Sequence, residues 1–393
     1  MKYLRLAIIG FGTVGQGFAE LLAARQDWIR HDFGLEVTLV SVANARDGFI
    51  YHQTGLDIPM LLELAASRRP LTEHPGVTHW ANTLEGLTTA DADVLAEATG
   101  TNLHDAEPGI SHIRTALARG RHVITANKGP GALAAEELFA LAHQHGVELR
   151  MESTVMAGTP ILSTISEGMA GAQISAIRGI LNGTTNYILS AMASGRDYND
   201  VLVEAQAQGY AEADPTADVE GYDALAKILI LSSLVFGRSL KPGDVYRQGI
   251  TAITREQVQR AVANGQRIKL IASIVSHPGE ARLEAKVAPV ELPLSDPLAR
   301  VDGVTNAITI HSDTLPKVTV IGPGAGRLQT GQGLLADLLA IAKTSWDHQK
   351  LFQFVFSLFT LLSILYDIAF MEKHILCGNA PLGIAPQEKL KIH

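Results

Sequence analysis

Short apolar runs alternate with amphipathic stretches along the first part of the chain. The runs at 4–9, 37–42, 94–98 and 122–125 are four to six residues long, which is the usual length of a buried strand. The stretch that follows the first run has helical spacing. Strands that alternate with helices in this way predict an α/β fold built on a parallel sheet, and we assign it to residues 1–150.

The pattern changes after Met151. Strands are predicted at 174–180, 267–275, 281–290 and 306–311, and helices at 184–193, 199–208 and 218–236. This mixture predicts an α+β domain over residues 151–315. A further apolar run at 317–321 leads into a glycine-rich turn and a helix, so residues 316–343 are expected to return to the first domain and complete it.

Residues 344–393 form an atypical apolar tail. The stretch at 351–371 is long enough to span a bilayer, although Gln353 and Asp367 interrupt it. A buried helix or an oligomerisation helix fits the same pattern, and the sequence alone does not choose among them.

Charge and cysteine content narrow the class of protein. The formal net charge of −8 argues against nucleic acid or an anionic membrane as the main partner. The single cysteine, Cys377, can form no internal disulfide, and the N-terminus has no signal-peptide pattern. These features predict a cytoplasmic enzyme that acts on a small molecule, rather than a membrane protein.

A glycine-rich motif follows the first predicted strand. Gly10, Gly12 and Gly15 form GxGxxG between that strand and a helix. In a dinucleotide-binding domain these glycines permit a tight turn, the approach of the pyrophosphate and close packing of helix on strand. An ordinary strand–helix turn can carry the same glycines, but this placement favours a Rossmann domain. The cofactor-binding residues expected in the motif are Gly10, Phe11, Gly12, Thr13, Val14 and Gly15.

The tip of the second predicted strand bears on the choice of cofactor. An acidic residue at this position favours NAD through the ribose hydroxyls, whereas an arginine accommodates the 2′-phosphate of NADP. Asn44 and Arg46 favour NADP, and Asp47 keeps NAD open.

Two other predicted strands end in distinctive segments, Glu97–Thr101 and Thr125–Pro130. Ligands bind at the carboxyl ends of strands in open α/β sheets. Lys128 in the second segment could therefore meet a cofactor phosphate or a substrate carboxylate. A solvated loop lysine explains it equally well.

Charged residues gather at 205–227. Glu212, Asp214 and Asp218 surround a proline-containing turn, and Asp223 and Lys227 follow four residues apart on one face of a helix. Asp218 could be only an N-cap, and the other two could form an ordinary helical ion pair. However, the helix is apolar nearly all round after the lysine, so it is expected to be buried. Charges there are costly unless they are paired or functional, which favours catalysis.

These features together resemble the homoserine dehydrogenase family. The frame that matches the family signature is Ala205, Gly209, Asp214-Pro215, Asp218, Gly221, Asp223 and Lys227. Further family-like segments are GFGTVGQG, EATGT, TANKGP, ILNGTTNYIL and VIGPGAG. The resemblance covers about residues 3–343 and implies NAD(P)-dependent interconversion of L-aspartate 4-semialdehyde and L-homoserine, in the biosynthesis of threonine, methionine and isoleucine.

The resemblance also implies roles for individual residues. Lys227 would be the catalytic proton donor and acceptor, with Lys128 and Asp223 as the other catalytic residues. Glu212, Asp218 and Asp223 match substrate-binding carboxylates.

Cofactor and cation ligands are implied in the same way. The positions that match dinucleotide contacts are Thr13, Val14, Thr99, Lys128 and Gly326. The loop Glu152–Thr159 resembles a sodium site, in which the Glu152 carboxylate and the carbonyl groups of Val155, Ala157 and Thr159 would surround the ion, although an irregular turn explains the loop as well.

The resemblance further implies a homodimer formed through the substrate domain. The tail departs from the family, because residues 344–393 are too few and too apolar for a regulatory ACT domain. Two rival interpretations remain at this point. One is another Rossmann dehydrogenase for a small amino or hydroxy acid, and the other is a dinucleotide sensor without catalytic activity.

Overall fold

The computed structural model describes residues 1–277, 279 and 282–344. Residues 1–341 form one unit, separate from residues 342–393, and this first unit is described below. Almost all of the predicted tail, including the apolar stretch at 351–371, lies outside the described residues. Among the residues that are described, no helix is long and apolar enough to cross a membrane.

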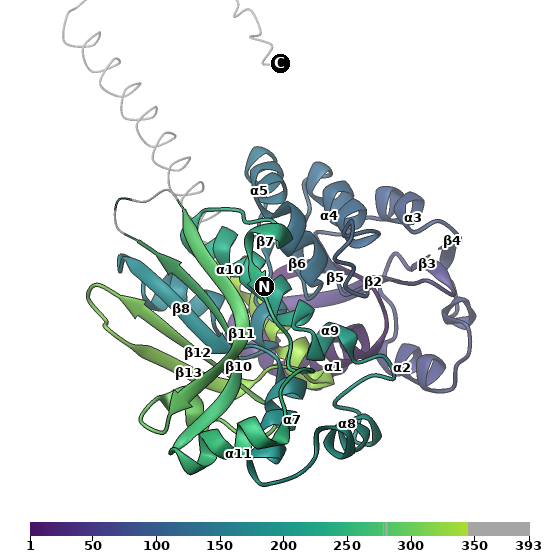
Figure 1. Cartoon of the computed structure of the whole chain (residues 1–393). Coiled ribbons are helices and arrows are strands. Elements are labelled where there is room, and N and C mark those ends of the chain that lie inside the picture. The colour runs from purple at the N-terminus through teal and green to yellow at the C-terminus, as the bar shows by residue number, and fades with distance from the viewer. Residues whose placement is uncertain (278, 280–281, 345–393) are drawn as a thin grey trace, which may run out of the picture. The chain divides into compact units, whose positions relative to one another are not determined.

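A seven-stranded sheet forms the N-terminal part (Figure 1), in the order β4-β3-β2-β1-β5-β6-β7. Its strands are β1 (Lys2–Ile9), β2 (Leu35–Asn44), β3 (Gly48–Tyr51), β4 (Thr78–Trp80), β5 (Val94–Glu97), β6 (His122–Thr125) and β7 (Leu149–Arg150). The pairs among β2, β1, β5, β6 and β7 are parallel, whereas β3 and β4 are antiparallel additions. The strand order reverses between β1 and β5, which is where open α/β sheets bind ligands. The predicted α/β class is confirmed.

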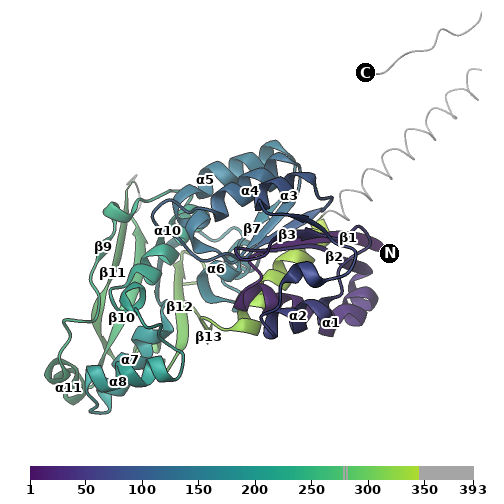
Figure 2. The same cartoon turned by 90° about the vertical axis from the view of Figure 1, so that its right-hand side faces the viewer.

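Helices cover both faces of this sheet. They are α1 (Thr13–Phe33), α2 (Ile58–Ala66), α3 (Thr83–Thr89), α4 (Gly109–Ala118) and α5 (Lys128–Gln144). Figure 2 shows α3, α4 and α5 on one face and α1 and α2 on the other. Because both faces are covered, every residue of β5 is buried, and the strand reads as a continuous apolar run with a single glutamate at its end.

The second part of the unit is built on a six-stranded sheet, in the order β13-β12-β8-β10-β11-β9. Its strands are β8 (Ile174–Ile180), β9 (Tyr246–Arg247), β10 (Gln266–Ser276), β11 (Leu283–Pro293), β12 (Thr305–Ser312) and β13 (Val318–Pro323). The accompanying helices are α6 (Ser153–Met156), α7 (Gly183–Ala193), α8 (Tyr198–Ala207), α9 (Thr216–Val219), α10 (Tyr222–Phe236) and α11 (Arg255–Ala263). Helix α10 packs against β10 and β11 and also against α5, and so joins the two parts (Figure 2).

Short helical segments complete the described fold. They are η1 (Leu71–Glu73), η2 (Thr164–Gly168), η3 (Pro242–Asp244) and η4 (Pro297–Arg300). A further helix lies at 327–344.

The helix predicted at 218–236 is two helices. Helix α9 ends at Val219, and α10 begins at Tyr222 after Gly221, whose φ of 79° is left-handed. Glycine adopts this conformation without steric cost and therefore breaks the helix. Asp218 thus lies on a separate turn from Asp223, rather than at the start of the same helix.

The segment 316–343 divides between the two parts. Its strand, β13, pairs antiparallel with β12 in the second sheet, so the expectation that this strand returns to the first domain is wrong. A close antiparallel hairpin forms more readily than a long return to another sheet. The helix at 327–344 packs on α1, where Arg327 hydrogen-bonds to Gln16 (3.1 Å) and Glu20 (3.2 Å).

Candidate active site

The carboxyl ends of the central strands meet at one edge of the first sheet. Ile9 pairs with Ala43 on one side and Glu97 on the other, and Glu97 pairs with Thr125. The turn after β1 is held by the N–H groups of Gly10 and Phe11, which both donate to the Ala43 carbonyl. Gly10 has a φ of 95°, and a Cβ there would lie 2.3 Å from the backbone of Ala98. Only glycine fits this turn.

The start of α1 is suited to an anion. Its N-cap, Gly12, supplies no side-chain hydrogen bond, and a Cβ at Gly12 would meet no atom within 4 Å. Gly12 and Thr13 are exposed. The N–H groups of a first helical turn attract negative charge, since the helix dipole is positive there. The open backbone therefore fits the pyrophosphate of a dinucleotide.

Gly326 lies close to this helix start. It precedes the helix at 327–344, whose Arg327 contacts Gln16 one turn into α1. A Cβ at Gly17 would lie 2.4 Å from the Arg327 carbonyl oxygen, so the two helices cross in close contact. Gly326 thus directly precedes the residue that contacts the first turns of α1.

Arg46, at the tip of β2, is held in place. Its Nε and Nη2 each lie 2.8 Å from an oxygen of Asp47, and further N–H groups donate to the carbonyls of Arg68 and Arg69. The hydrogen bonds from Arg46 lower the pKa of Asp47 to about 2. Asn44 donates to the same carboxylate. The Asp47 side chain is 5% exposed.

Lys227 is buried at the junction of α10, α5 and the loop after β8. Its Nζ donates to the Leu181 carbonyl and to Oδ2 of Asp223, at 2.8 Å in the second case. Lys128, the first residue of α5, places its Nζ 3.5 Å from Oδ1 of Asp223. Asp223 therefore lies between two lysines that come from different parts of the fold. This is the cluster that the signature predicts.

Burial and charge set the protonation of this cluster. Burial lowers the pKa of Lys227, and the charge of Lys128 adds to this, while Asp223 opposes it. Burial of Asp223 opposes its ionisation, but Lys227 and Lys128 outweigh that effect and hold its pKa well below the ordinary value. The arrangement is an ionised carboxylate beside an ammonium that gives up its proton more readily than usual.

Asn182 was missed by the sequence reasoning. Its Nδ2 donates to Asp218 (2.7 Å) and to Asp223 (3.1 Å), and its Oδ1 accepts from Thr185 as the N-cap of α7. Burial and the nearby Asp223 raise the pKa of Asp218, and the hydrogen bond from Asn182 opposes this. Asn182 thus holds two carboxylates together that would otherwise repel.

Glu212 lies apart from this cluster. It is exposed in the loop between α8 and α9. Its backbone carbonyl oxygen accepts a hydrogen bond from Gln206. Asp214, also exposed, accepts from the N–H of Thr216. Of the predicted substrate-binding carboxylates, the structure brings together Asp218 and Asp223.

The expected cation loop is compact and buried. The Glu152 carboxylate accepts the N–H groups of residues 161–163 at 2.7–2.8 Å. Asp337 accepts the N–H of Glu152, and burial followed by the Glu152 charge raises the pKa of Asp337 to about 8. Two buried carboxyl groups would gain from a cation. Oxygen donors also suit a hard ion, so this donor set fits one.

The residues whose carbonyl groups are expected to bind the cation lie in the same turn. Val155, Ala157 and Thr159 are buried, and Ala157 has a φ of 50°. Among the described residues no group of three or more His, Cys, Asp or Glu side chains is arranged as a metal site. A cation here would depend mainly on backbone oxygens.

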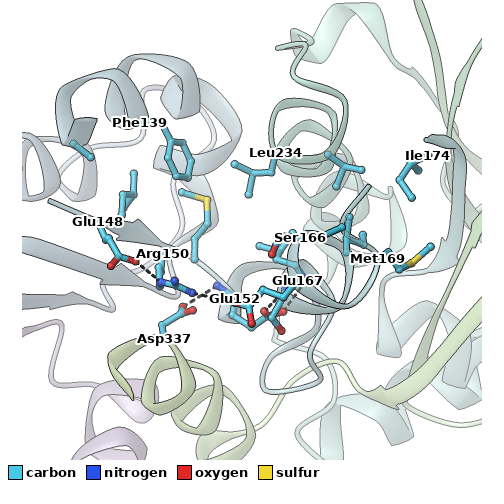
Figure 3. A pocket seen from close by; sticks show the side chains of 18 of the residues that line it. Phe139, Glu148, Arg150, Glu152, Ser166, Glu167, Met169, Ile174, Leu234 and Asp337 are labelled. Carbon is cyan, nitrogen blue, oxygen red and sulfur yellow. Dashed lines mark hydrogen bonds and ion pairs between the residues drawn. The ribbon is translucent and has the colours of Figure 1, made fainter. Parts of the chain in front are cut away.

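A cavity of about 860 Å³ opens on this loop rather than on the lysine cluster. Figure 3 shows Glu152 and Asp337 on its wall, with Arg150 reaching toward Glu148 and Glu167. The rest of the lining is largely apolar and includes Phe139 from α5 and Leu234 from α10. Its lining residues include none of Lys128, Asp223 and Lys227.

Comparison with known proteins gives matches over nearly all of the described chain. The family model described as homoserine dehydrogenase matches residues 160–339, and that of the NAD-binding domain of homoserine dehydrogenase matches residues 10–152. The NAD(+)-dependent homoserine dehydrogenase of Pseudomonas canavaninivorans is 39% identical over 350 residues, which are 89% of this chain and 99% of that protein.

Solved structures of homoserine dehydrogenases are also similar to this chain. A homoserine dehydrogenase from Thiobacillus denitrificans is 34% identical, with a TM-score of 0.76 over 88% of this chain and 75% of that one. A mutant hyperthermophilic archaeal homoserine dehydrogenase in complex with NADPH is 28% identical, with a TM-score of 0.75 over 87% of this chain and 98% of that one.

Proposed function

Since the chain belongs to the homoserine dehydrogenase family, we propose that its lysine–carboxylate cluster carries out proton transfer in that family's reaction. The protein is an NAD(P)-dependent oxidoreductase that interconverts L-homoserine and L-aspartate 4-semialdehyde, a step of amino-acid biosynthesis. One observation carries the proposal: Lys227 is buried, bonded to Asp223 and close to Lys128.

Lys227 is the proposed acid and base. A dinucleotide held at the glycine turn and the start of α1 would supply or accept the hydride at the carbon that bears the reacting oxygen. As an ammonium, Lys227 gives a proton to that oxygen during reduction, and as an amine it removes the proton during oxidation. An ordinary lysine has a pKa of about 10.4. Burial lowers the pKa of Lys227 and so raises the fraction of the amine form near neutral pH.

The carboxylates are proposed to hold the α-ammonium of the substrate. Asp218 and Asp223 are already adjacent, with Asn182 between them. Glu212 would have to approach from its exposed loop, which is a movement of the kind that substrate binding drives. On the other side, Thr99, the glycine turn and the start of α1 are proposed to bind the dinucleotide.

Steady-state assays with homoserine and each cofactor test this function. We expect NAD(P)-dependent oxidation of L-homoserine and little oxidation of lactate, malate or serine, since those substrates lack the same spacing of ammonium and hydroxyl groups. Faster turnover of another hydroxy or amino acid would favour a different dehydrogenase. Dinucleotide binding without turnover of any of them would favour a sensor.

Replacing Asn182 by Ser should raise KM for homoserine by about tenfold, since two buried carboxylates lose a donor. Serine is also a good N-cap, so α7 should remain intact. The acidic limb of kcat/KM should move to higher pH, because Asn182 lowers the pKa of Asp218. KM and pH profiles check this, with thermal melting as the folding control. A parent-like KM and profile would remove Asn182 from the site.

A preference for NADP(H) is proposed on the position of Arg46. Replacing Arg46 by Ala should weaken NADP more than NAD, by about tenfold, since a guanidinium pairs strongly with phosphate. Arg46 already pairs with Asp47, so a 2′-phosphate would have to compete with the Asp47 carboxylate for the guanidinium. Dissociation constants for both cofactors measure it, with Arg114→Ala on α4 as the control. Equal effects on NAD and NADP would contradict the proposal.

A monovalent cation, sodium, is proposed at the Glu152 loop. The melting temperature should rise with NaCl more than with tetramethylammonium chloride at equal ionic strength, because a ligand of the folded state stabilises it. Glu152→Gln should abolish that difference. Equal melting curves in the two salts for the parent protein would argue against a cation site.

Homodimerisation through the second domain is likewise proposed, and analytical ultracentrifugation tests it. A cytoplasmic location stays a prediction from the sequence.

A further inference from the structure

Glu97 is a fully buried carboxylate that the proposed mechanism does not use. It is the last residue of β5, and its side chain has an exposed fraction of 0%. Strand β5 lies between β1 and β6 in the interior of the sheet. Burying a carboxylate is costly unless its oxygens are hydrogen-bonded. Its contacts therefore indicate what it does.

Those contacts lead to Thr99, a proposed dinucleotide ligand in the segment that follows β5. Oε1 of Glu97 accepts the N–H of Thr99 at 3.1 Å and also the Thr99 hydroxyl. Oε2 faces the hydroxyl of Thr125 at 3.4 Å. On the remaining side, Nδ1 of His112 in α4 lies 3.6 Å from Oε1, and this buried nitrogen has no hydrogen-bond partner among the residues that the structure describes.

A second set of contacts leads from Thr99 to Lys128. Asn127 donates through Nδ2 to the Thr99 hydroxyl (3.1 Å), and its Oδ1 accepts the N–H of Gly129 as the N-cap of α5. Lys128 is the first residue of that helix and reaches Asp223. Since the Thr99 hydroxyl oxygen accepts from Asn127, its single proton is free to go to Glu97. The direction of every hydrogen bond in this series is thereby fixed.

We propose that Glu97 is a positioning residue, whose carboxylate fixes Thr99 for the dinucleotide and, through Thr99 and Asn127, the start of α5 that presents Lys128 to the reaction. This rests on the proposed roles of Thr99 and Lys128. Glu97 touches neither reactant. Its effect comes from accepting two donors on one oxygen, which an amide oxygen can also do, whereas an apolar side chain cannot.

The test compares Glu97→Leu with Glu97→Gln. Leucine fills the buried space but leaves the Thr99 donors unpaired, so the dinucleotide Kd should rise about tenfold and kcat should fall about tenfold through the displaced Lys128. Glutamine keeps the acceptor and should restore both values to within about threefold of the parent. Glu137→Gln, on the exposed face of α5, is the control. Parent-like Kd and kcat in a folded Glu97→Leu protein would overturn the proposal, as would a Gln variant as impaired as the Leu variant.

Two further variants separate this proposal from the proposed function. In a Lys128→Met background, Glu97→Leu should still raise the dinucleotide Kd but add no further loss of kcat. If Lys128→Met alone leaves kcat unchanged, the proposed role of Lys128 is wrong, while the dinucleotide Kd of Glu97→Leu still tests the role of Glu97. Asn127→Ser keeps a cap for α5 but withdraws the donor to Thr99, so it should lower kcat whether or not Glu97→Leu folds. A parent-like kcat for Asn127→Ser would overturn the connection to Lys128.

Discussion

Lys227→Ala is expected to lower kcat by about 10²–10⁴-fold, the usual contribution of general acid–base catalysis. Lys227 is buried beside Asp223, and alanine leaves no group at that place to exchange a proton. The dinucleotide Kd should barely change, because its proposed ligands lie at the glycine turn and the start of α1. Steady-state kcat in both directions and a fluorescence titration with NADPH measure the two effects.

Lys269 offers a matched control for that experiment. It is also a buried lysine, held in the second sheet by Asn186, Val301 and Asp302. Lys269→Met should lower the melting temperature, because its partners are left unpaired, yet the folded enzyme should keep its kcat. Equal losses of kcat in the two variants would mean that Lys227 matters for folding and not for chemistry.

Asp223→Asn should lower kcat/KM for homoserine by about 100-fold or more, since removing one partner of a buried ion pair costs several kcal/mol. It should also change the pH dependence. Asp223 raises the pKa of Lys227, so its loss lowers that pKa further. The pH limb assigned to Lys227 should therefore move to lower pH in both directions of the reaction, and pH profiles of kcat/KM measure this.

Lys128→Met should shift the pKa of Lys227 in the opposite direction. The charge of Lys128 lowers the pKa of Lys227, so its removal should move the same limb to higher pH. Limbs that do not move in either variant would show that the titrating group is not Lys227.

The fold follows from the sequence where burial alone decides the pattern. Strands β6 and β8 were predicted with their observed bounds, 122–125 and 174–180. Strand β6 is a short run whose last three residues are buried, as expected of a strand covered on both faces. In β8 the exposed Ser175 and the half-buried Arg178 stand among apolar residues, and the apolar positions alone were enough to mark the strand. Strands β3 and β4 were not predicted. They are short antiparallel additions at the edge of the sheet, where few positions must be apolar.

The two errors have different causes. The break between α9 and α10 depends on one left-handed glycine, Gly221, in a stretch that otherwise looks helical. The placement of β13 depends on pairing with β12, which is a long-range choice between two sheets that hydrophobic pattern cannot report.

The candidate site was predictable in part. Lys227 and Asp223 were found because a charged pair at helical spacing stands out in an apolar helix. Asn182 and the Leu181 carbonyl could not be found in this way, since both lie more than 40 positions earlier and reach Lys227 and Asp223 only through folding. The segment ILNGTTNYIL marked the region, but spacing alone gave Asn182 no role.

The most direct test of the central claim is kcat for homoserine oxidation by Lys227→Arg. Arginine keeps the positive charge beside Asp223, but its pKa exceeds about 12, so it does not readily give up a proton. If Lys227 transfers the proton, the Arg variant should fold and bind homoserine while its kcat falls nearly as far as that of Lys227→Ala. An Arg variant that turns over near the parent rate would contradict the claim, make Lys227 a structural partner of Asp223, and leave Lys128 as the proton donor.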